Sequence, residues 1–197
     1  MLSGISRDLP STLVLAAWLV FWVVFLWQKR ANRARSASRA PRAYTGIVLH
    51  GAAFALVFGV LRAPGTPILP LGPVAALALD AVWVALAWSS IALMLWAIRR
   101  MGRQWAVAAR IVARHELITT GPFRVVRNPI YTGLFGAMIA TGGVLARPAA
   151  LLAAIPLFLL GTLIRVREEQ ALLRAEFGAA YDEYTRRVPA LVPRPWR

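Results

Sequence analysis

Two polar clusters in the second half of the chain carry residue types that could bind a charged ligand. The first lies in the segment 99–128, which contains His115 and leads into Arg127-Asn128-Pro129-Ile130-Tyr131. The second cluster is Arg165-Val166-Arg167-Glu168-Glu169. Two adjacent carboxylates at the base of an apolar segment are costly unless they are paired with a cation. They therefore either form salt bridges with neighbouring arginines or help to bind a ligand that carries both signs of charge.

The first cluster also has the features of a loop that leads into a helix. The segment has about thirty residues, which is too long for a simple connection, and Thr119-Thr120-Gly121-Pro122 predicts a turn within it. Pro129 suits the first turn of a helix, and Asn128 suits the N-cap. The N–H groups and the positive dipole end of such a helix can bind a carboxylate or a phosphate.

The elements that must position both clusters are strongly apolar. The chain has 197 residues, of which 59% are hydrophobic, and its mean hydropathy is +0.60, whereas soluble domains are about 45–50% apolar. Most of the excess lies in blocks that are typical of membrane-spanning helices, namely residues 11–27, 44–61, 74–98, 131–145 and 149–164. Only Ala146-Arg147-Pro148 separates the last two blocks. We therefore expect a tight helical hairpin that brings the two polar clusters together.

Two further patterns concern this hairpin and the segment that follows it. One face of the fourth block has small residues that allow close helix packing, namely Gly133, Gly136, Ala140 and Gly143. After Ile164 the chain turns polar but stays periodic, and an amphipathic helix is expected on the cytoplasmic face, ending near Arg187. Its apolar stripe consists of Leu172, Leu173, Phe177, Tyr181 and Tyr184.

The basic residues predict the orientation in the membrane. The net charge is +15, and 20 of the 23 basic residues lie in the segments 29–42, 99–127 and 165–197. The other side of the predicted spans has Arg7, Arg62 and Arg147. Because cytoplasmic segments are enriched in Lys and Arg, we expect five spans, the N-terminus outside, and the C-terminus and both clusters inside. This topology accounts for the arginines, so nucleic-acid binding is not expected, and a bacterial inner membrane is the expected location.

The two clusters resemble the cofactor signature of the isoprenylcysteine carboxyl methyltransferase family, a pattern that phospholipid methyltransferases share in general form. The resemblance is carried by the runs 115–123 and 127–133 and by the later run from Glu168 to Pro189. It covers about residues 102–193, and the first three blocks match only as generic membrane helices.

The resemblance implies a fold and a domain organisation. We expect an all-α integral membrane protein with about five transmembrane helices, a cytoplasmic cofactor-binding loop and a C-terminal amphipathic helix. The chain would form a single membrane domain. In it, residues 1–98 supply three N-terminal transmembrane helices, and residues 99–197 form the methyltransferase core of cofactor loop, helical hairpin and C-terminal helix.

The same resemblance implies an S-adenosylmethionine site on the cytoplasmic face, built without a Rossmann domain. The implied cofactor-binding residues are His115, Glu116, Leu117, Ile118, Phe123, Arg127, Asn128, Pro129, Ile130, Tyr131 and Glu168. The implied catalytic residues are Glu169 and Arg165. Arg165 would orient an acceptor carboxylate, although it is offset by one position from the arginine of the family. Asn128 replaces a histidine of the family; it keeps a hydrogen bond but cannot titrate. The charges of the cofactor agree with this set, since Glu168 can pair with its cationic groups and Arg127 can bind its carboxylate.

The expected activity is methyl transfer to a lipidic or small apolar acceptor that arrives through the bilayer. Carboxyl O-methylation of a prenylcysteine-like molecule comes first, and a phospholipid or other amine and a thiol are alternatives. An amine would need a base, for which His115 and Glu169 are the candidates. A non-enzymatic membrane protein on the same scaffold is the other alternative, whereas a sterol reductase would need more helices.

Cysteine is absent, which excludes disulfides, zinc–thiolate sites and a cysteine nucleophile, and no metal site is expected.

Overall fold

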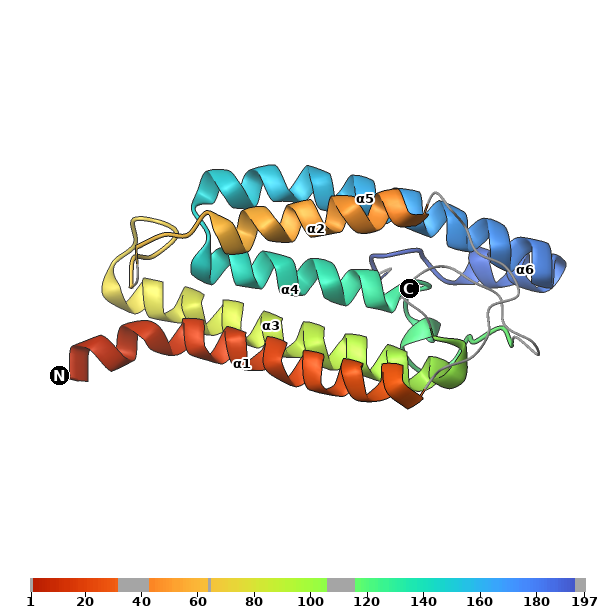
Figure 1. Cartoon of the computed structure of the whole chain (residues 1–197), viewed down its shortest axis with the longest axis horizontal. Coiled ribbons are helices and arrows are strands. Elements are labelled where there is room, and N and C mark those ends of the chain that lie inside the picture. Colours follow the sequence, from red (N-terminus) through yellow and green to blue (C-terminus); the bar gives the residue numbers. More distant parts are fainter. Residues whose placement is uncertain (1, 32–42, 64, 106–115, 194–197) are drawn as a thin grey trace.

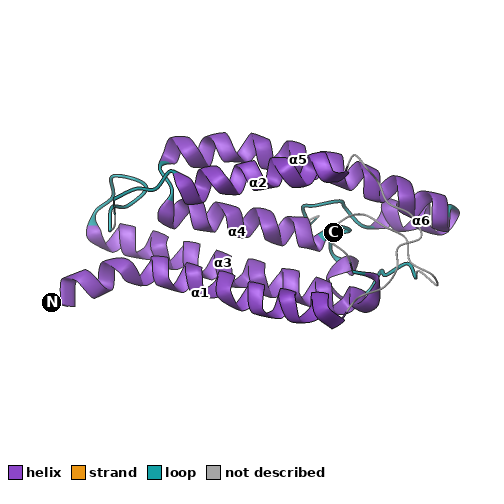
Figure 2. Ribbon diagram, viewed as in Figure 1, coloured by secondary structure: helices purple, strands orange, loops and turns teal. Residues whose placement is uncertain are grey.

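The protein is a bundle of nearly parallel and antiparallel helices. The computed structural model describes residues 2–31, 43–63, 65–105 and 116–193. Within these ranges the helices are α1 (Leu2–Ala31), α2 (Ala43–Gly59), α3 (Pro73–Met101), η1 (Gly102–Gln104), η2 (Gly121–Arg124), α4 (Pro129–Leu145), α5 (Pro148–Phe177) and α6 (Ala179–Arg187). Figure 1 shows α4 between two helix pairs, α2 with α5 on one side and α1 with α3 on the other. Figure 2 shows that helices make up nearly all of the described chain.

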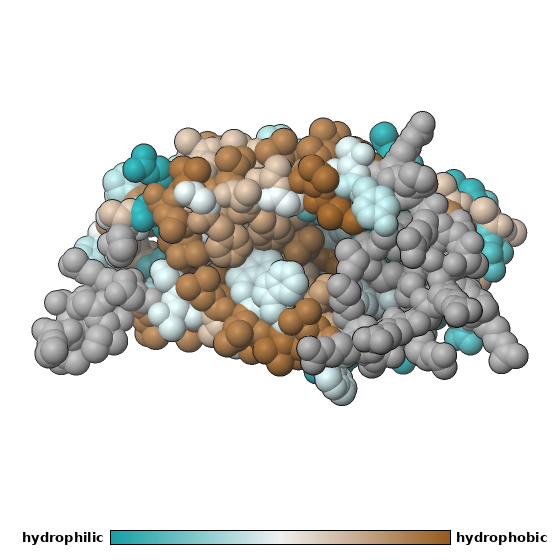
Figure 3. Space-filling model, viewed as in Figure 1, coloured by the Kyte–Doolittle hydropathy of each residue, from teal (hydrophilic) through white to brown (hydrophobic). Residues whose placement is uncertain are grey.

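The helices are those of a multi-pass integral membrane protein. Three of them are long and apolar enough to cross a membrane, with spans at Leu9–Gln28, Pro73–Met101 and Pro148–Phe177. Two shorter apolar helices, Tyr44–Gly59 and Pro129–Leu145, lie beside them. Large hydrophobic side chains such as Leu19 and Leu152 are more than half exposed, as expected for contact with lipid. Figure 3 shows hydrophobic residues over the middle of the visible face and hydrophilic residues towards its ends.

The fifth helix is longer than the sequence predicts. It continues without interruption from Pro148 to Phe177, so the segment after Ile164 belongs to the same helix as the apolar block. Residues 165–177 are rich in Arg, Glu, Gln, Leu and Ala, all of which favour helix, and they contain no proline. The helix ends at Gly178, whose φ of +50° is accessible mainly to glycine, and the expected amphipathic helix is reduced to the short α6. At 1.5 Å per residue, α5 is about 45 Å long and can extend beyond a hydrocarbon core of about 30 Å.

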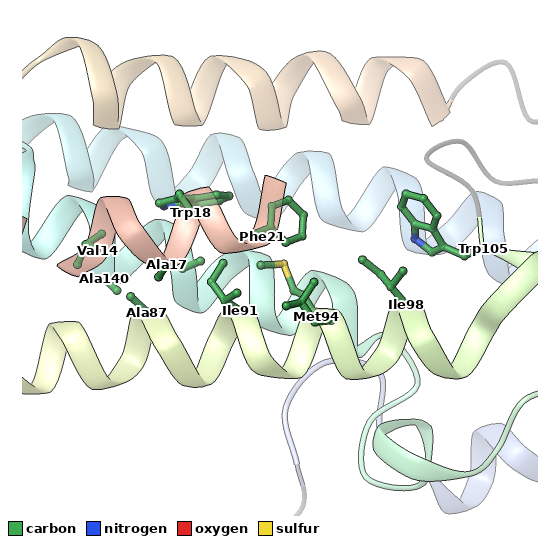
Figure 4. Packing of buried hydrophobic residues seen from close by; sticks show 12 residues of the cluster. Val14, Ala17, Trp18, Phe21, Ala87, Ile91, Met94, Ile98, Trp105 and Ala140 are labelled. Carbon is green, nitrogen blue, oxygen red and sulfur yellow. The ribbon is translucent and has the colours of Figure 1, made fainter. Parts of the chain in front are cut away.

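Small residues allow close packing between the helices. A Cβ atom on Gly133 would lie 2.7 Å from the Ser90 carbonyl oxygen of α3, closer than van der Waals contact permits. The predicted packing role of this face of α4 is thereby confirmed. Trp18 and Phe21 of α1 belong to one apolar cluster with Ile91 and Met94 of α3 (Figure 4). The bundle is held mainly by such apolar contacts, with a few buried polar pairs between helices.

The hairpin between α4 and α5 is closed by an arginine from another loop. The turn lies at residues 146–147, as the sequence predicts, because α4 ends at Leu145 and α5 begins at Pro148. The guanidinium group of Arg62 donates to the carbonyl oxygens of Gly143, Val144 and Ala146, at 2.9, 2.7 and 2.8 Å. Since the last carbonyls of a helix have no partner within it, Arg62 satisfies the C-terminal end of α4.

Arg62→Gln is expected to lower the stability of the bundle more than Arg147→Gln. The first change removes hydrogen bonds from a charged group to three helix carbonyls, a loss of about 2 kcal/mol. The second removes the same charge from an exposed residue whose Nε donates to the Leu61 carbonyl at 3.3 Å, so its loss should stay below about 0.5 kcal/mol. Thermal unfolding of both purified variants in detergent measures the difference. Equal melting temperatures would contradict the capping role of Arg62.

Candidate functional site

Three polar side chains from α4 and α5 form a hydrogen-bonded group, which we call the polar triad: Tyr131, Arg165 and Glu169. The Nε of Arg165 donates to the Tyr131 hydroxyl at 2.7 Å, and this hydroxyl donates to Glu169 Oε1. Arg165 Nη2 also lies 3.4 Å from Glu169 Oε1. Arg165 and Tyr131 are only 6% and 7% exposed. A buried charge is tolerated when it is paired and hydrogen-bonded, and the triad meets both conditions.

The secondary structure explains why these three residues meet. Arg165 and Glu169 are four residues apart on α5, so their side chains project from the same face of that helix. Pro129 occupies the first turn of α4, and Tyr131 follows it at the end of α4 that lies beside the middle of α5. The hairpin therefore brings the two polar clusters together, as its short connection predicts.

A cavity of about 70 Å³ lies next to the triad. Residues from α3, η1, η2, α5 and α6 and from the loop before α4 line it: Met101, Gln104, Glu116, Leu117, Ile118, Phe123, Arg127, Asn128, Glu169, Gln170, Leu173, Tyr181 and Tyr184. A wider groove of about 440 Å³ shares Tyr184 with the cavity. The other residues of this groove are Thr119, Arg124, Ala180, Glu183, Arg187 and Val188.

The structure brings many of the predicted site residues to this cavity. Those that line it are Glu116, Leu117, Ile118, Phe123, Arg127, Asn128 and Glu169. Tyr131 and Arg165 are not among the lining residues, but both bond Glu169, which is. Pro129, Ile130 and Glu168 lie elsewhere: Pro129 is buried at the start of α4, and Ile130 packs against the core between α1 and α3. His115 falls outside the described residues.

The two adjacent carboxylates differ in their surroundings. Glu169 bonds the triad and lines the cavity, whereas Glu168, one residue earlier on the helix, is not part of the lining. The face of α5 that lines the cavity consists of Glu169, Gln170 and Leu173, and Glu168 lies outside this face. The geometry thus favours Glu169 over Glu168 as the carboxylate that could meet a bound cation.

Arg127 supplies positive charge on another side of the cavity. Its Nε is buried and has no hydrogen-bond partner within the described part of the chain. Burial raises the pKa of the Tyr181 phenol, although Arg127 beside it acts in the opposite direction. Burial also raises the pKa of Tyr184, whose hydroxyl donates to the Phe123 carbonyl at 2.6 Å. Both phenols are therefore neutral at physiological pH, and the lining combines the charges of Arg127, Glu116 and Glu169 with aromatic surface.

The segment after α6 lies along the start of α4, and we call residues 189–191 the strap. The backbone N–H groups of Arg127 and Asn128 donate to the carbonyls of Pro189 and Ala190 at 2.8 and 3.0 Å. The side-chain amide of Asn128 donates to the Ala190 carbonyl at 2.9 Å, so Asn128 holds the N-cap position of α4 without a side-chain capping bond. The strap surrounds this helix end with carbonyl oxygens. These oxygens are poor neighbours for an anion, and Arg127 is the cationic side chain among the described residues that line the cavity.

One buried polar residue near the triad was given no role from the sequence. His50 of α2 is 7% exposed, and its Nε2 lies 2.9 Å from the Thr162 hydroxyl oxygen of α5. Its ring centroid is 6.0 Å from that of Tyr131. The sequence did contain a signal for His50, because an ionisable residue within a membrane-spanning apolar block is a candidate functional residue by itself.

Among the described residues, no group of three His, Asp or Glu side chains is placed to hold a metal ion.

Asn128→Asp is expected to loosen the strap, because a carboxylate cannot donate to the Ala190 carbonyl and repels it. If the variant loses about 1.4 kcal/mol of the free energy that holds the strap on α4, the fraction of molecules with a detached strap rises about tenfold. Limited digestion with trypsin at the exposed Arg186 and Arg187 measures this opening. Thr66→Val removes a hydroxyl bond at the opposite end of the bundle and should digest like the unaltered protein. Unchanged cleavage of the Asn128 variant would show that the strap is held without this amide.

Comparison with known proteins connects this site with a family. The model of the phospholipid methyltransferase family matches residues 80–180, which include both polar clusters and half of the chain. Nickel-cobalt-cadmium resistance protein NccN of Alcaligenes xylosoxydans xylosoxydans is 32% identical over 118 residues, which are 58% of this chain and 54% of that protein. Protein-S-isoprenylcysteine O-methyltransferase B of Arabidopsis thaliana is 30% identical over 99 residues, 49% of this chain and 50% of that protein.

A third relative is methanethiol S-methyltransferase 2 of Bradyrhizobium diazoefficiens, which is 38% identical over 72 residues, 36% of this chain and 27% of that protein. The chain thus spans about half, or less, of the length of these curated relatives. The match to the family model confirms the resemblance read from the two clusters. The chain belongs to the phospholipid methyltransferase family of membrane methyltransferases.

Proposed function

We propose that the protein transfers the methyl group of S-adenosylmethionine to a lipidic or small apolar acceptor at the membrane surface. The family uses this methyl donor. The observation that carries the proposal is the convergence of the segment 116–128 and Glu169 on one cavity, with opposite charges on its wall. The sequence motif and the geometry both support this site.

The residues of the cavity fit the charged end of the cofactor. Arg127 has a buried Nε without a partner among the described residues, which suits a carboxylate, and Glu169 suits a sulfonium or an amino group. Ligand sites typically measure about 300–1,000 Å³, so the small cavity has room for part of such a molecule only. The adjoining groove of about 440 Å³ offers the remaining volume, next to the aromatic ring of Tyr184.

The chain's own residues would act by orientation and by exclusion of water. The bound cofactor supplies an activated methyl group, and its transfer is an in-line displacement that needs no covalent intermediate on the protein. Tyr131 and Arg165 hold the Glu169 carboxylate in one direction through two hydrogen bonds. Apolar lining residues such as Leu117 and Leu173 reduce the water around the reacting groups and strengthen these electrostatic interactions.

Carboxyl O-methylation of a prenylcysteine-like acceptor is the first candidate reaction. It is supported by the similarity to the plant protein named as an isoprenylcysteine O-methyltransferase and by the presence of Arg165 beside the cavity. In this proposal Arg165 acts on the acceptor carboxylate, for which its bonds to Tyr131 and Glu169 would have to rearrange.

Thiol S-methylation is the second candidate, and a specific observation favours it. A thiol acceptor needs no cationic anchor, which agrees with the engagement of Arg165 by Tyr131 and Glu169. The similarity to the protein named methanethiol S-methyltransferase 2 supports the same reaction.

An amine acceptor would place Glu169 in the role of base. A non-enzymatic role on this scaffold is the remaining alternative, since one relative is named as a metal-resistance protein.

We also propose the orientation, in which five spans place the N-terminus outside and the cavity at the cytoplasmic face of a bacterial inner membrane. The bias of basic residues supports it, because Arg62 and Arg147 lie at the C-terminal end of α4, whereas the cavity lies near the start of that helix. The absence of cysteine makes a direct test simple.

Single cysteines at Thr66 and Ala175 are expected to report opposite sides of the membrane. Both positions are exposed, Thr66 in the loop before α3 and Ala175 near the end of α5. A membrane-impermeant maleimide added to intact cells should label Thr66→Cys, and it should label Ala175→Cys only after permeabilisation. The reverse pattern would overturn the orientation, and labelling of both in intact cells would overturn the number of spans.

S-adenosylhomocysteine is expected to raise the melting temperature of the purified protein, because a ligand that binds the folded state stabilises it. Glu169→Gln should weaken the affinity about tenfold or more, since a charged hydrogen-bonding partner is worth about 1.5–3 kcal/mol. Glu168→Gln should weaken it less, because Glu168 does not line the cavity. Glu176→Gln, an exposed change on the same helix, is the matched control and should bind normally.

An unchanged melting curve of the unaltered protein would contradict the proposal. If the ligand does raise the melting temperature, incubation of membranes with methyl-labelled cofactor identifies the acceptor. A labelled ester, thioether or methylated amine, found by mass spectrometry, distinguishes the three acceptor classes.

A further inference from the structure

Helix α2 lies outside the segment 80–180 that matches the family, yet it packs directly against the polar triad. A Cβ atom on Gly46 would overlap the Cγ of Arg165 and would lie 2.7 Å from the carbonyl oxygen of Gly161. A Cβ atom on Gly161 would in turn lie 2.8 Å from the Gly46 carbonyl oxygen. Glycine at both positions thus lets the two helix backbones touch, and α2 forms the wall behind the aliphatic part of Arg165.

His50 follows Gly46 by one helical turn and faces the same neighbour. Its ring stacks on Phe158 of α5, with centroids 4.4 Å apart and planes inclined by 21°. Its Nε2 is hydrogen-bonded to the hydroxyl of Thr162, and this pair is buried. Phe158, Thr162 and Arg165 follow one another along one face of α5, so His50 fixes the two turns of that helix that precede Arg165.

Hydrogen bonds and one turn of α5 connect His50 with the cavity. Thr162 is one turn before Arg165, Arg165 donates to Tyr131, and Tyr131 donates to Glu169, which lines the cavity. An apolar pair in place of His50 and Thr162 would fill the same volume, but it would not fix a side-chain direction as a buried hydrogen bond does.

We propose that His50 is a positioning residue of the active site, which holds Thr162 and, through Arg165 and Tyr131, sets the direction of the Glu169 carboxylate in the cavity. The proposal rests on the proposed function, and it extends the active unit to α2. Its prediction is that binding at the cavity depends on a residue that does not touch the ligand.

The test is a double-mutant cycle between His50 and Thr162. His50→Phe keeps a ring that can stack on Phe158 but removes the hydrogen bond, and Thr162→Val removes the partner hydroxyl with little change of shape. Each single variant should bind S-adenosylhomocysteine about tenfold more weakly in calorimetry. The double variant should bind it no more weakly than either single variant. His50→Gln retains a hydrogen-bonding atom and should restore most of the affinity. Gly51→Ala, on α2 with nothing within 4 Å of the added atom, should bind normally.

A second measurement does not depend on the ligand. The Nε–H of Arg165, bonded to Tyr131, should give a distinct ¹⁵N-correlated resonance that Arg165→Lys removes. This resonance should shift in His50→Phe and in Thr162→Val, and it should keep its position in His50→Gln and in Gly51→Ala.

The two measurements separate the inference from the function on which it rests. Unchanged resonance and unchanged affinity in His50→Phe, or additive losses in the double variant, would overturn the positioning role. Shifts of the resonance in a protein that does not bind S-adenosylhomocysteine would support the contact series and contradict the proposed function instead.

Discussion

The bond between Tyr131 and the two charged residues of α5 is the interaction on which the rest of the site depends. Arg165 is buried in an apolar bundle, where a charge without a partner would be strongly destabilising. The phenol of Tyr131 accepts from Arg165 and donates to Glu169, so it joins opposite charges and also joins α4 to α5. One oxygen of the Glu169 carboxylate is thereby held by the protein, while the residue also faces the cavity. The packing of α4 on α5 and the proposed binding site therefore use the same carboxylate.

Small residues place the triad where it can form. Gly133 lets α4 approach α3, and Gly46 with Gly161 lets α2 approach α5. Close approach matters in a membrane, because lipid is as apolar as the helix surfaces and association relies on tight packing and on hydrogen bonds between helices. The packing of α2 on α5 places Gly46 against the aliphatic part of Arg165, whose guanidinium group reaches Tyr131. The apolar framework thus determines the geometry of the polar groups.

The sequence predicts most of the architecture and part of the site, and the differences have physical causes. The short connection at residues 146–148 is enough to place both polar clusters at one end of the bundle. The choice between Glu168 and Glu169 was not predictable, because it depends on which face of α5 turns toward α4. The continuation of α5 past Ile164 was missed because a change from apolar to polar residues marks a change of surroundings and need not end a helix. The strap left no signal in the sequence, since most of its acceptors are main-chain carbonyls that any residue supplies.

The strap is synthesised after the helix end that it contacts. Residues 189–191 leave the ribosome after all six described α-helices, and chains fold progressively as they emerge. Until then, the N–H groups of Arg127 and Asn128 lack their carbonyl partners and must bond water at the membrane surface. The cavity wall that these two residues form is therefore completed at a late stage of synthesis. A nascent chain can be fully inserted in the bilayer and still lack a finished cavity wall.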